Sequence, residues 1–131
     1  MNKKDLKREY KETKPPMGIF QIRNLTNGKV FISSSMNLDG IINRHRFQLN
    51  ASGHPNKALQ ADWNELGEGK FAFEILEELE PRENLDNRKE LAFLEDLWLE
   101  KEEPYGERGY NERKKTREER LQMIAANRKT D

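Results

Sequence analysis

Apolar residues recur along the central part of the chain with two different periods, which predict strands in some segments and helices in others. Residues 71–79 read FAFEILEEL, in which large apolar side chains alternate with other residues closely enough to predict a strand. Farther along, Leu91, Leu94 and Trp98 recur at helical spacing within a polar segment. We therefore expect a helix over about 87–102.

Two further strands are expected near the start of this central region. The segment over residues 18–35 reads GIFQIRNLTNGKVFISSS, with apolar stretches over about 18–23 and 29–33. Asn27-Gly28 lies between them, and this pair accepts the positive backbone angles of a tight hairpin turn. The segment therefore predicts a β-hairpin that carries one phenylalanine from each strand on the same face.

Two helices are expected between the hairpin and the third strand. Asn37 is a suitable N-cap for a helix over about 38–49, which the sequence SGHPN then ends. A second helix over about 56–66 stops at Gly67. The expected order is β-β-α-α-β-α. It predicts an α+β domain in which a small, mainly antiparallel sheet is flanked by helices.

Composition divides the chain into one globular domain and two charged ends. Only 34% of the 131 residues are hydrophobic and 37% are charged, which is too polar for a compact fold along the whole length. We expect a charged helical arm over residues 1–16, ended by two prolines, and a globular domain over 17–111. Residues 112–131 form a charged helix or a disordered tail.

The sequence also excludes several kinds of chemistry. It contains no cysteine, which rules out disulfides, thiolate metal sites and a cysteine nucleophile. It contains no apolar run long enough to cross a membrane and no apolar segment of a signal peptide near the N-terminus, so we expect a cytoplasmic protein with no membrane partner. Its two histidines lack metal-ligand spacing, which argues against zinc.

Charge is unevenly distributed although the formal net charge is zero. Residues 18–60 hold five Lys/Arg and one Asp, whereas residues 61–111 hold six Lys/Arg and sixteen acids. A basic face formed by the first group would suit a polyanion such as nucleic acid. The alternative is that the two groups intermix in space. The candidate nucleic-acid contacts are Arg23, Lys29, Arg44, Arg46 and Lys57.

The order of elements, together with particular short segments, resembles the GIY-YIG nuclease family. The two tripeptides of that name correspond to Gly18-Ile19-Phe20 and Phe31-Ile32-Ser33 on the two hairpin strands. The likeness covers residues 17–111. The other matching segments are NGK at 27–29, SSMNL at 34–38, NRH at 43–45, GHPNKALQADWNELG at 53–67, FAFEILEEL at 71–79, LEDLWLE at 94–100 and GYN at 109–111.

The resemblance implies cleavage of phosphodiesters, but several residues at the implied site differ from those of the family. Members of the family cleave phosphodiesters with one divalent metal; two tyrosines and an arginine position water and stabilise charge, and a glutamate holds the metal. The tyrosine positions fall on Phe20 and Phe31, and the arginine position falls on Ile41. Glu95 falls on the metal position, where Mg²⁺ or Mn²⁺ is implied. The remaining polar positions are His45, His54 and Asn111.

Each of these residues also has a purely structural interpretation. Phe20 and Phe31 are most simply sheet packing, with base stacking as the alternative. Glu95 is either a rim carboxylate paired with a nearby base or part of a retained polar pocket. His45 lies four residues from Ile41 and is either a hydrogen-bonded histidine of the core rim or a site residue. His54 precedes a proline and is placed to cap the next helix.

Three functions remain open at this stage. The favoured one is a domain that binds nucleic acid, with DNA favoured over RNA, and whose metal-dependent cleavage is weak or lost. Losing one charge-stabilising donor typically costs about 10²–10³ in rate, and losing acid–base help costs about 10²–10⁴. The second is an active endonuclease in which another group, such as Arg44 three residues from Ile41, replaces the arginine. The third is a regulatory domain that binds a protein partner on a former nuclease fold.

Overall fold

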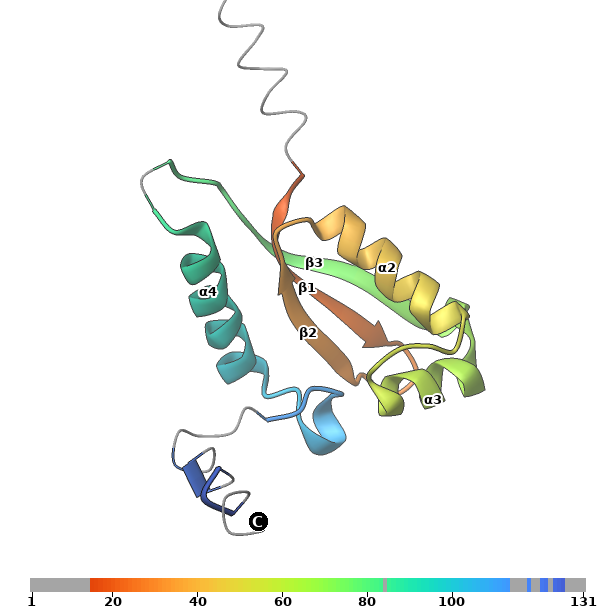
Figure 1. Ribbon diagram of the computed structural model, residues 1–131. Helices are drawn as coiled ribbons and strands as arrows, with labels where there is room; N and C mark the ends of the chain where they lie inside the picture. The colour runs from red at the N-terminus through yellow and green to blue at the C-terminus, as the bar shows by residue number, and fades with distance from the viewer. Residues whose placement is uncertain (1–14, 84, 114–117, 119–120, 123, 127–131) are drawn as a thin grey trace, which may run out of the picture.

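The computed structural model describes residues 15–83, 85–113, 118, 121–122 and 124–126. A three-stranded sheet separates helices α2 and α3 from helix α4, which lies against the other side (Figure 1). The architecture is therefore α+β, as the hydrophobic pattern predicts. The elements are β1 (Met17–Asn24), β2 (Val30–Ser35), α2 (Leu38–Asn50), α3 (Lys57–Leu66), β3 (Phe71–Leu79) and α4 (Asn87–Glu102), with short 3₁₀ turns at Glu68–Lys70 and Gly106–Arg108.

Strand β1 lies at the centre of the sheet, and both of its neighbours run antiparallel to it in the order β2-β1-β3. A central strand is covered on both faces, which explains why six of the eight residues of β1 are buried. The pairing with β3 shifts register between Ile19 and Phe20, whose partners are Glu77 and Ile75. Leu76 is thus the extra residue of a β-bulge.

The hairpin turn lies between the two predicted strands and contains Asn27-Gly28, but only one residue of this pair has the positive backbone angle that was expected of both. The backbone N–H of Asn24 donates to the carbonyl oxygen of Lys29, and the N–H of Gly28 donates to the carbonyl oxygen of Asn24, both at 2.8 Å. Only Gly28 in this turn has positive φ, at 80°. The buried Asn24 sets this shape because its side-chain oxygen accepts the N–H of Thr26 at 2.9 Å.

The predicted helix signals are confirmed. The side chain of Asn37 accepts the backbone N–H of Gly40 at 3.0 Å and caps α2. Asn56 caps α3 by accepting the N–H of Leu59 at 3.0 Å, so this helix begins one residue later than predicted. It ends at Gly67, which has a φ of 87°. The third strand and the long helix α4 occupy the predicted ranges.

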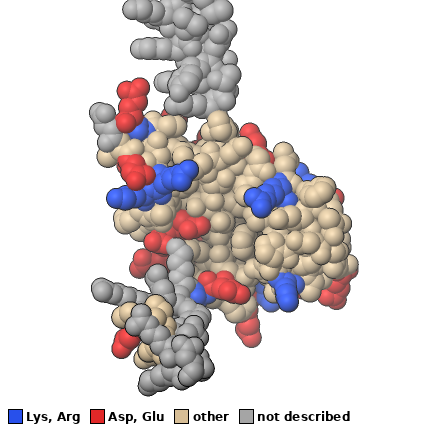
Figure 2. Space-filling view, in the orientation of Figure 1, with Lys and Arg blue, Asp and Glu red and all other residues tan. Residues whose placement is uncertain are grey.

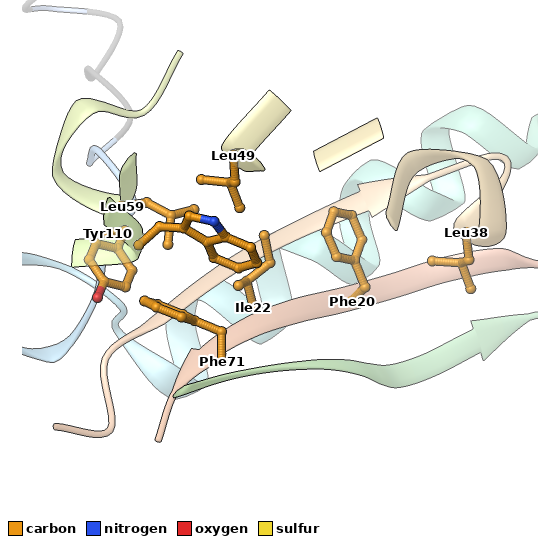
Figure 3. Close-up of a cluster of buried hydrophobic side chains, with 8 residues drawn as sticks. Phe20, Ile22, Leu38, Leu49, Leu59, Phe71 and Tyr110 are labelled. Carbon is orange, nitrogen blue, oxygen red and sulfur yellow. The ribbon is translucent and has the colours of Figure 1, made fainter. Parts of the chain in front are cut away.

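Two separate apolar clusters hold the layers together. The first lies between the sheet and helices α2 and α3 (Figure 3). The second lies between the sheet and α4. Alternate residues of β1 contribute to opposite clusters, as expected for a strand covered on both faces. The buried members of the first are Phe20, Ile22, Leu38, Leu49, Leu59, Trp63, Phe71 and Tyr110, and those of the second are Ile19, Ile32, Leu91 and Leu99.

The loop after α4 folds back onto the sheet through Tyr110. Its hydroxyl donates to Asp62 Oδ2 at 2.6 Å and accepts a hydrogen bond from Asn24 Nδ2 at 3.0 Å. Its backbone N–H donates to the carbonyl oxygen of Val30 at 2.9 Å. Burial, together with the hydrogen bond to Asp62, raises the pKa of Tyr110 to about 12. This residue therefore joins β1, β2 and α3 at one end of the domain.

The structure describes only part of the two charged ends. The helix expected within residues 1–16 falls on positions 3–13, which lie outside the described residues. The described positions of the tail between 118 and 126 have helical backbone. Within the part of the chain that the structure describes, no helix is long and apolar enough to span a membrane.

Candidate functional site

The two phenylalanines lie on one face of the hairpin, as predicted, and both contact histidine. Phe20 is fully buried in the cluster beneath α2 (Figure 3), and its ring centroid is 5.5 Å from that of His45. Phe31 is half-buried, with its ring 5.7 Å from His45 and 6.2 Å from His54. The four rings therefore form one aromatic cluster between the sheet and the segment that carries α2 and the following loop.

Ile41 is the third apolar residue among the predicted catalytic positions. It lies four residues before His45 on α2, is half-buried, and packs against the first core cluster. Arg44, considered above as a replacement for the missing arginine, is exposed. Since Ile41 and Arg44 lie three residues apart on the helix, Arg44 occupies a neighbouring position and does not replace the side chain at position 41.

A short hydrogen bond joins His45 Nδ1 to His54 Nε2 at 2.6 Å, and we call these two side chains the histidine pair. The backbone N–H of Asn56 donates to His54 Nδ1 at 3.0 Å, so Nδ1 is the unprotonated nitrogen of a neutral His54. Its proton is then on Nε2, which must donate to His45 Nδ1. A neutral His45 therefore carries its own proton on Nε2. The network fixes both tautomers.

Both imidazoles are held in the neutral form. Burial, the neighbouring His54 and the charge of Arg44 lower the pKa of His45 to about 4. Burial also lowers the pKa of His54. Nε2 of His45 has no hydrogen-bond partner among the described residues. Every buried side-chain nitrogen and oxygen of those residues does have a partner, so Nε2 is not buried and reaches solvent. At neutral pH, His45 thus presents an N–H donor at the surface.

Glu95 approaches the hairpin from α4, at the edge formed by β2. Its Oε1 accepts hydrogen bonds from the hydroxyls of Ser33 at 3.4 Å and Ser34 at 3.3 Å, and the side chain is half-buried. Ser33 is paired with Phe20 across the sheet. The carboxylate therefore lies at the strand edge beside the pair that contains Phe20, on a different element from the histidine pair.

The donor set at Glu95 provides one carboxylate and neutral hydroxyl oxygens. No group of three or more His, Asp and Glu side chains is placed to hold a metal ion in the described part of the chain. Mg²⁺ is commonly held by one or two carboxylates, with water and substrate phosphate completing its shell. Glu95 fits that mode of binding, and it does not fit a metal held by protein ligands alone.

Asn111 has a structural contact at the outer edge of β2. Its Oδ1 accepts the backbone N–H of Ile32 at 2.9 Å, and its Nδ2 donates to the Ile32 carbonyl oxygen at 2.7 Å. This amide thus pairs with both backbone groups of one β2 residue. It positions Phe31 and Ser33, the two neighbours of Ile32, and its polar atoms point at the strand.

Two of the five predicted basic contacts form ion pairs with acids of the second half of the chain. Arg23 donates to both oxygens of Glu74, at 2.6 and 3.1 Å, and Arg46 lies 3.2 Å from Glu68. Charges of the two halves therefore intermix at these points. The Nζ atom of Lys29 lies 5.8 Å from the Tyr110 ring centroid.

The other two predicted basic contacts, Arg44 and Lys57, are exposed, and neither forms an ion pair with another described residue. In the view of Figure 2, blue and red atoms are interspersed over the α4 side, whereas on the α2 side blue patches lie in a largely uncharged surface with red atoms at its margins. The residues on the α2 side are therefore the better placed to meet a polyanion.

Three contributors to the site were not found by sequence reasoning. Asn56 fixes the tautomers of the histidine pair, and Ser33 and Ser34 hold Glu95. In the sequence, Ser33 stood out only as the last residue of the second tripeptide. The run of three serines that ends β2 was the available signal, because adjacent hydroxyls at a strand end are suited to hold a carboxylate.

Comparison with known proteins agrees with the fold described above. The catalytic domain of homing endonuclease I-TevI, a GIY-YIG enzyme, superposes with a TM-score of 0.63 at 28% identity, covering 75% of this chain and 99% of that one. The chain has a GIY-YIG-like fold. A glutamate-to-alanine variant of the I-TevI catalytic domain, described as an intron endonuclease, gives a TM-score of 0.62 at 26% identity, covering 77% of this chain and 97% of that one.

No protein-family model and no curated protein matches the chain. The GIY-YIG-like fold accounts for the positions of the two tripeptides, which lie antiparallel on β1 and β2 with Phe20 opposite Ser33.

Proposed function

We propose that this GIY-YIG-like domain binds nucleic acid, with DNA favoured over RNA, and that its phosphodiester cleavage is weak or lost. The similarity to the catalytic domain of an endonuclease supports a nuclease-like domain. The proposal of reduced cleavage is supported by one observation. Phe20, Phe31 and Ile41, which the resemblance assigns to the positions of the two tyrosines and the arginine, are all apolar; the two rings lie against His45, and Phe20 is fully buried.

These three side chains lack the polar groups that phosphodiester hydrolysis needs. A benzyl ring can neither orient water through a hydroxyl nor relay a proton, and an aliphatic side chain cannot neutralise the charge that develops on phosphate. The nitrogen of His45 that would accept a proton is occupied by His54. Its exposed Nε2 carries a proton at neutral pH and is suited to donate to a phosphate oxygen.

Glu95 is the residue that would hold a divalent cation. The cation would supply charge neutralisation at a bound phosphate, and the hydroxyls of Ser33 and Ser34 would keep the carboxylate oriented. A cation held by one carboxylate needs a phosphate oxygen and water to complete its coordination shell. Metal affinity is therefore expected to rise when nucleic acid is present.

A nicking assay tests the proposal. Supercoiled plasmid is incubated with Mg²⁺ or Mn²⁺ and either the parent protein or a variant carrying Phe20→Tyr, Phe31→Tyr and Ile41→Arg together. We expect the variant to nick at least about 10²-fold faster, because a single charge-stabilising donor is typically worth that much. Circular dichroism and thermal unfolding verify that the variant is folded, since the hydroxyl at the buried position 20 needs a polar partner.

Binding is measured separately by fluorescence anisotropy over a series of salt concentrations. The proposal predicts that the parent binds at low salt and loses affinity steeply as salt is raised. An absence of binding at low salt would disprove the binding function. Rapid nicking by the parent would disprove the loss of cleavage while leaving the binding function intact.

The second candidate is an active metal-dependent endonuclease, and the contact that orients Glu95 through the two serines favours it. This candidate predicts that Glu95→Ala abolishes nicking by the parent protein. Glu90→Ala on the same helix is a matched control, because that residue lies in the first turn of α4 and has no contact with Ser33 or Ser34 among those given by the structure. Equal activity of parent and Glu95→Ala would eliminate it.

A further inference from the structure

The solvent-facing side of α2 carries an aromatic side chain with an unusual degree of exposure. Phe47 is 73% exposed, more than any other large hydrophobic side chain among the described residues. It lies on the helix face opposite His45, two residues away, so it belongs neither to the aromatic cluster nor to the core. Core packing therefore does not explain this phenylalanine.

The neighbours of Phe47 on this face are uncharged or basic. Asn43 and Arg44 lie one turn before it, Asn50 lies one turn after it, and all three are exposed. The only acid of α2 is Asp39, eight residues before Phe47, which is about 12 Å along the helix. An isolated aromatic ring beside a guanidinium and amides, without a nearby carboxylate on its helix, is the surface chemistry of nucleic-acid contacts.

A second exposed phenylalanine provides a contrast. Phe93 on α4 is 67% exposed, but Leu97, four residues farther along, is also 46% exposed. Leu97 lines a cavity of about 210 Å³ together with Leu94 and Trp98. The pocket is also lined by Glu77 and Lys101, and a patch that joins several apolar side chains to a carboxylate suits a protein partner better than a nucleic acid. Phe47 differs because it is a single ring in polar surroundings.

We propose that Phe47 stacks on an unpaired base of single-stranded nucleic acid and that Arg44 binds an adjacent phosphate. The inference rests on the proposed function and adds a contact surface on the outside of α2, away from Phe20 and Glu95. A base inside a duplex is covered on both faces, whereas an unpaired base offers a free π-face to the ring. The guanidinium forms charge-assisted hydrogen bonds with phosphate oxygens.

Fluorescence anisotropy with a labelled oligothymidylate and the full chain tests this contact. Phe47→Ala is expected to weaken binding by about 5- to 150-fold, the range that corresponds to the loss of one base–aromatic stack. Phe93→Ala is the matched control, because it removes a ring of similar exposure, and it should leave binding unchanged. Arg44→Gln should weaken binding and reduce the slope of log affinity against log salt by about 1.

A second readout reports stacking directly. Phe47→Trp should keep the affinity, and its indole emission should be quenched on addition of the oligonucleotide, beyond any change seen in the parent protein. If the parent binds and Phe47→Ala binds equally well, the stacking contact is disproved and the proposed function stands. If the parent binds no nucleic acid at low salt, the proposed function itself fails. Equal affinity for a blunt duplex with equal dependence on Phe47 would overturn the assignment to unpaired bases.

Discussion

Acidification from pH 7 to pH 4.5 is expected to destabilise the fold through the histidine pair. Protonation of His45 would place a second proton in the 2.6 Å contact between its Nδ1 and the Nε2–H of His54, so the hydrogen bond must break. The groups that act on His45 are His54 and the charge of Arg44, and both favour the neutral ring. Protonation therefore occurs more readily in the unfolded chain.

The direction and size of the effect follow from the pKa. Its value for His45 falls from 6.5 to about 4 on folding, so the unfolded state binds more protons between these two values and stability is lost as pH falls through this window. At 1.36 kcal/mol for each unit of pKa, the upper limit is about 3.4 kcal/mol. Because Nε2 reaches solvent, we reduce this limit and expect a loss of about 1–2 kcal/mol.

Urea denaturation at several pH values, followed by tryptophan fluorescence, measures this change because Trp63 is buried. The variant His45→Gln has no ring to titrate, and its free energy of unfolding should vary less with pH between 4.5 and 7. Carboxylates affect stability at lower pH than this pair does. The hydrogen bond from Arg23 lowers the pKa of Glu74, so the stability contributed by their pairing is lost only below the ordinary pH range of carboxylate titration.

Two results would refute the reasoning. The parent protein could have the same free energy of unfolding at pH 4.5 and pH 7, or His45→Gln could show the same dependence on pH as the parent. Nitrogen chemical shifts in NMR provide an independent check, since His54 Nδ1 should have the shift of an unprotonated nitrogen at pH 7.

Three further predictions concern the framework of the site. Gly18→Ala should destabilise the protein by about 1–3 kcal/mol in urea denaturation, because the new Cβ would overlap the backbone of β3, whereas Gly69→Ala, where nothing lies within 4 Å, should not. Asn111→Ala should cost about 1–3 kcal/mol by leaving backbone groups of β2 unpaired, and unchanged stability would contradict that contact. Arg23→Gln should raise the pKa of Glu74 toward its ordinary value, as followed by carbonyl NMR shifts; an unchanged value would contradict their pairing.

Much of the fold was predictable because its signals are local. Asn37 and Asn56 cap their helices through hydrogen bonds to backbone groups three residues away, and such contacts depend on nearby sequence alone. The detailed shape of the hairpin turn, in which Asn27 lacks positive φ, was not predictable because it depends on Asn24. That side chain is buried and bound to Tyr110, 86 residues farther along the chain, which no local pattern reveals.

In the candidate site, too, features set by local sequence were predictable and features set by contacts between distant segments were not. Alternation along the hairpin was sufficient to place Phe20 and Phe31 on one face. The histidine pair could not be predicted, because it forms only when the loop before α3 brings His54 beside His45. The contact of Glu95 with Ser33 likewise depends on how α4 lies against the edge of the sheet.

The amide of Asn111 has a consequence for the behaviour of the protein at high concentration. By pairing with the N–H and carbonyl of Ile32, it imitates the backbone of an additional strand. Tyr110 likewise covers the carbonyl of Val30, so these two positions of the border offer no template to a second molecule and growth of the sheet is hindered there. The opposite border carries the exposed carboxylates of Glu77 and Glu78, whose repulsion disfavours pairing with a second copy, whereas the charge of Glu74 is paired with Arg23. Resistance to aggregation is therefore built into both borders of this small sheet.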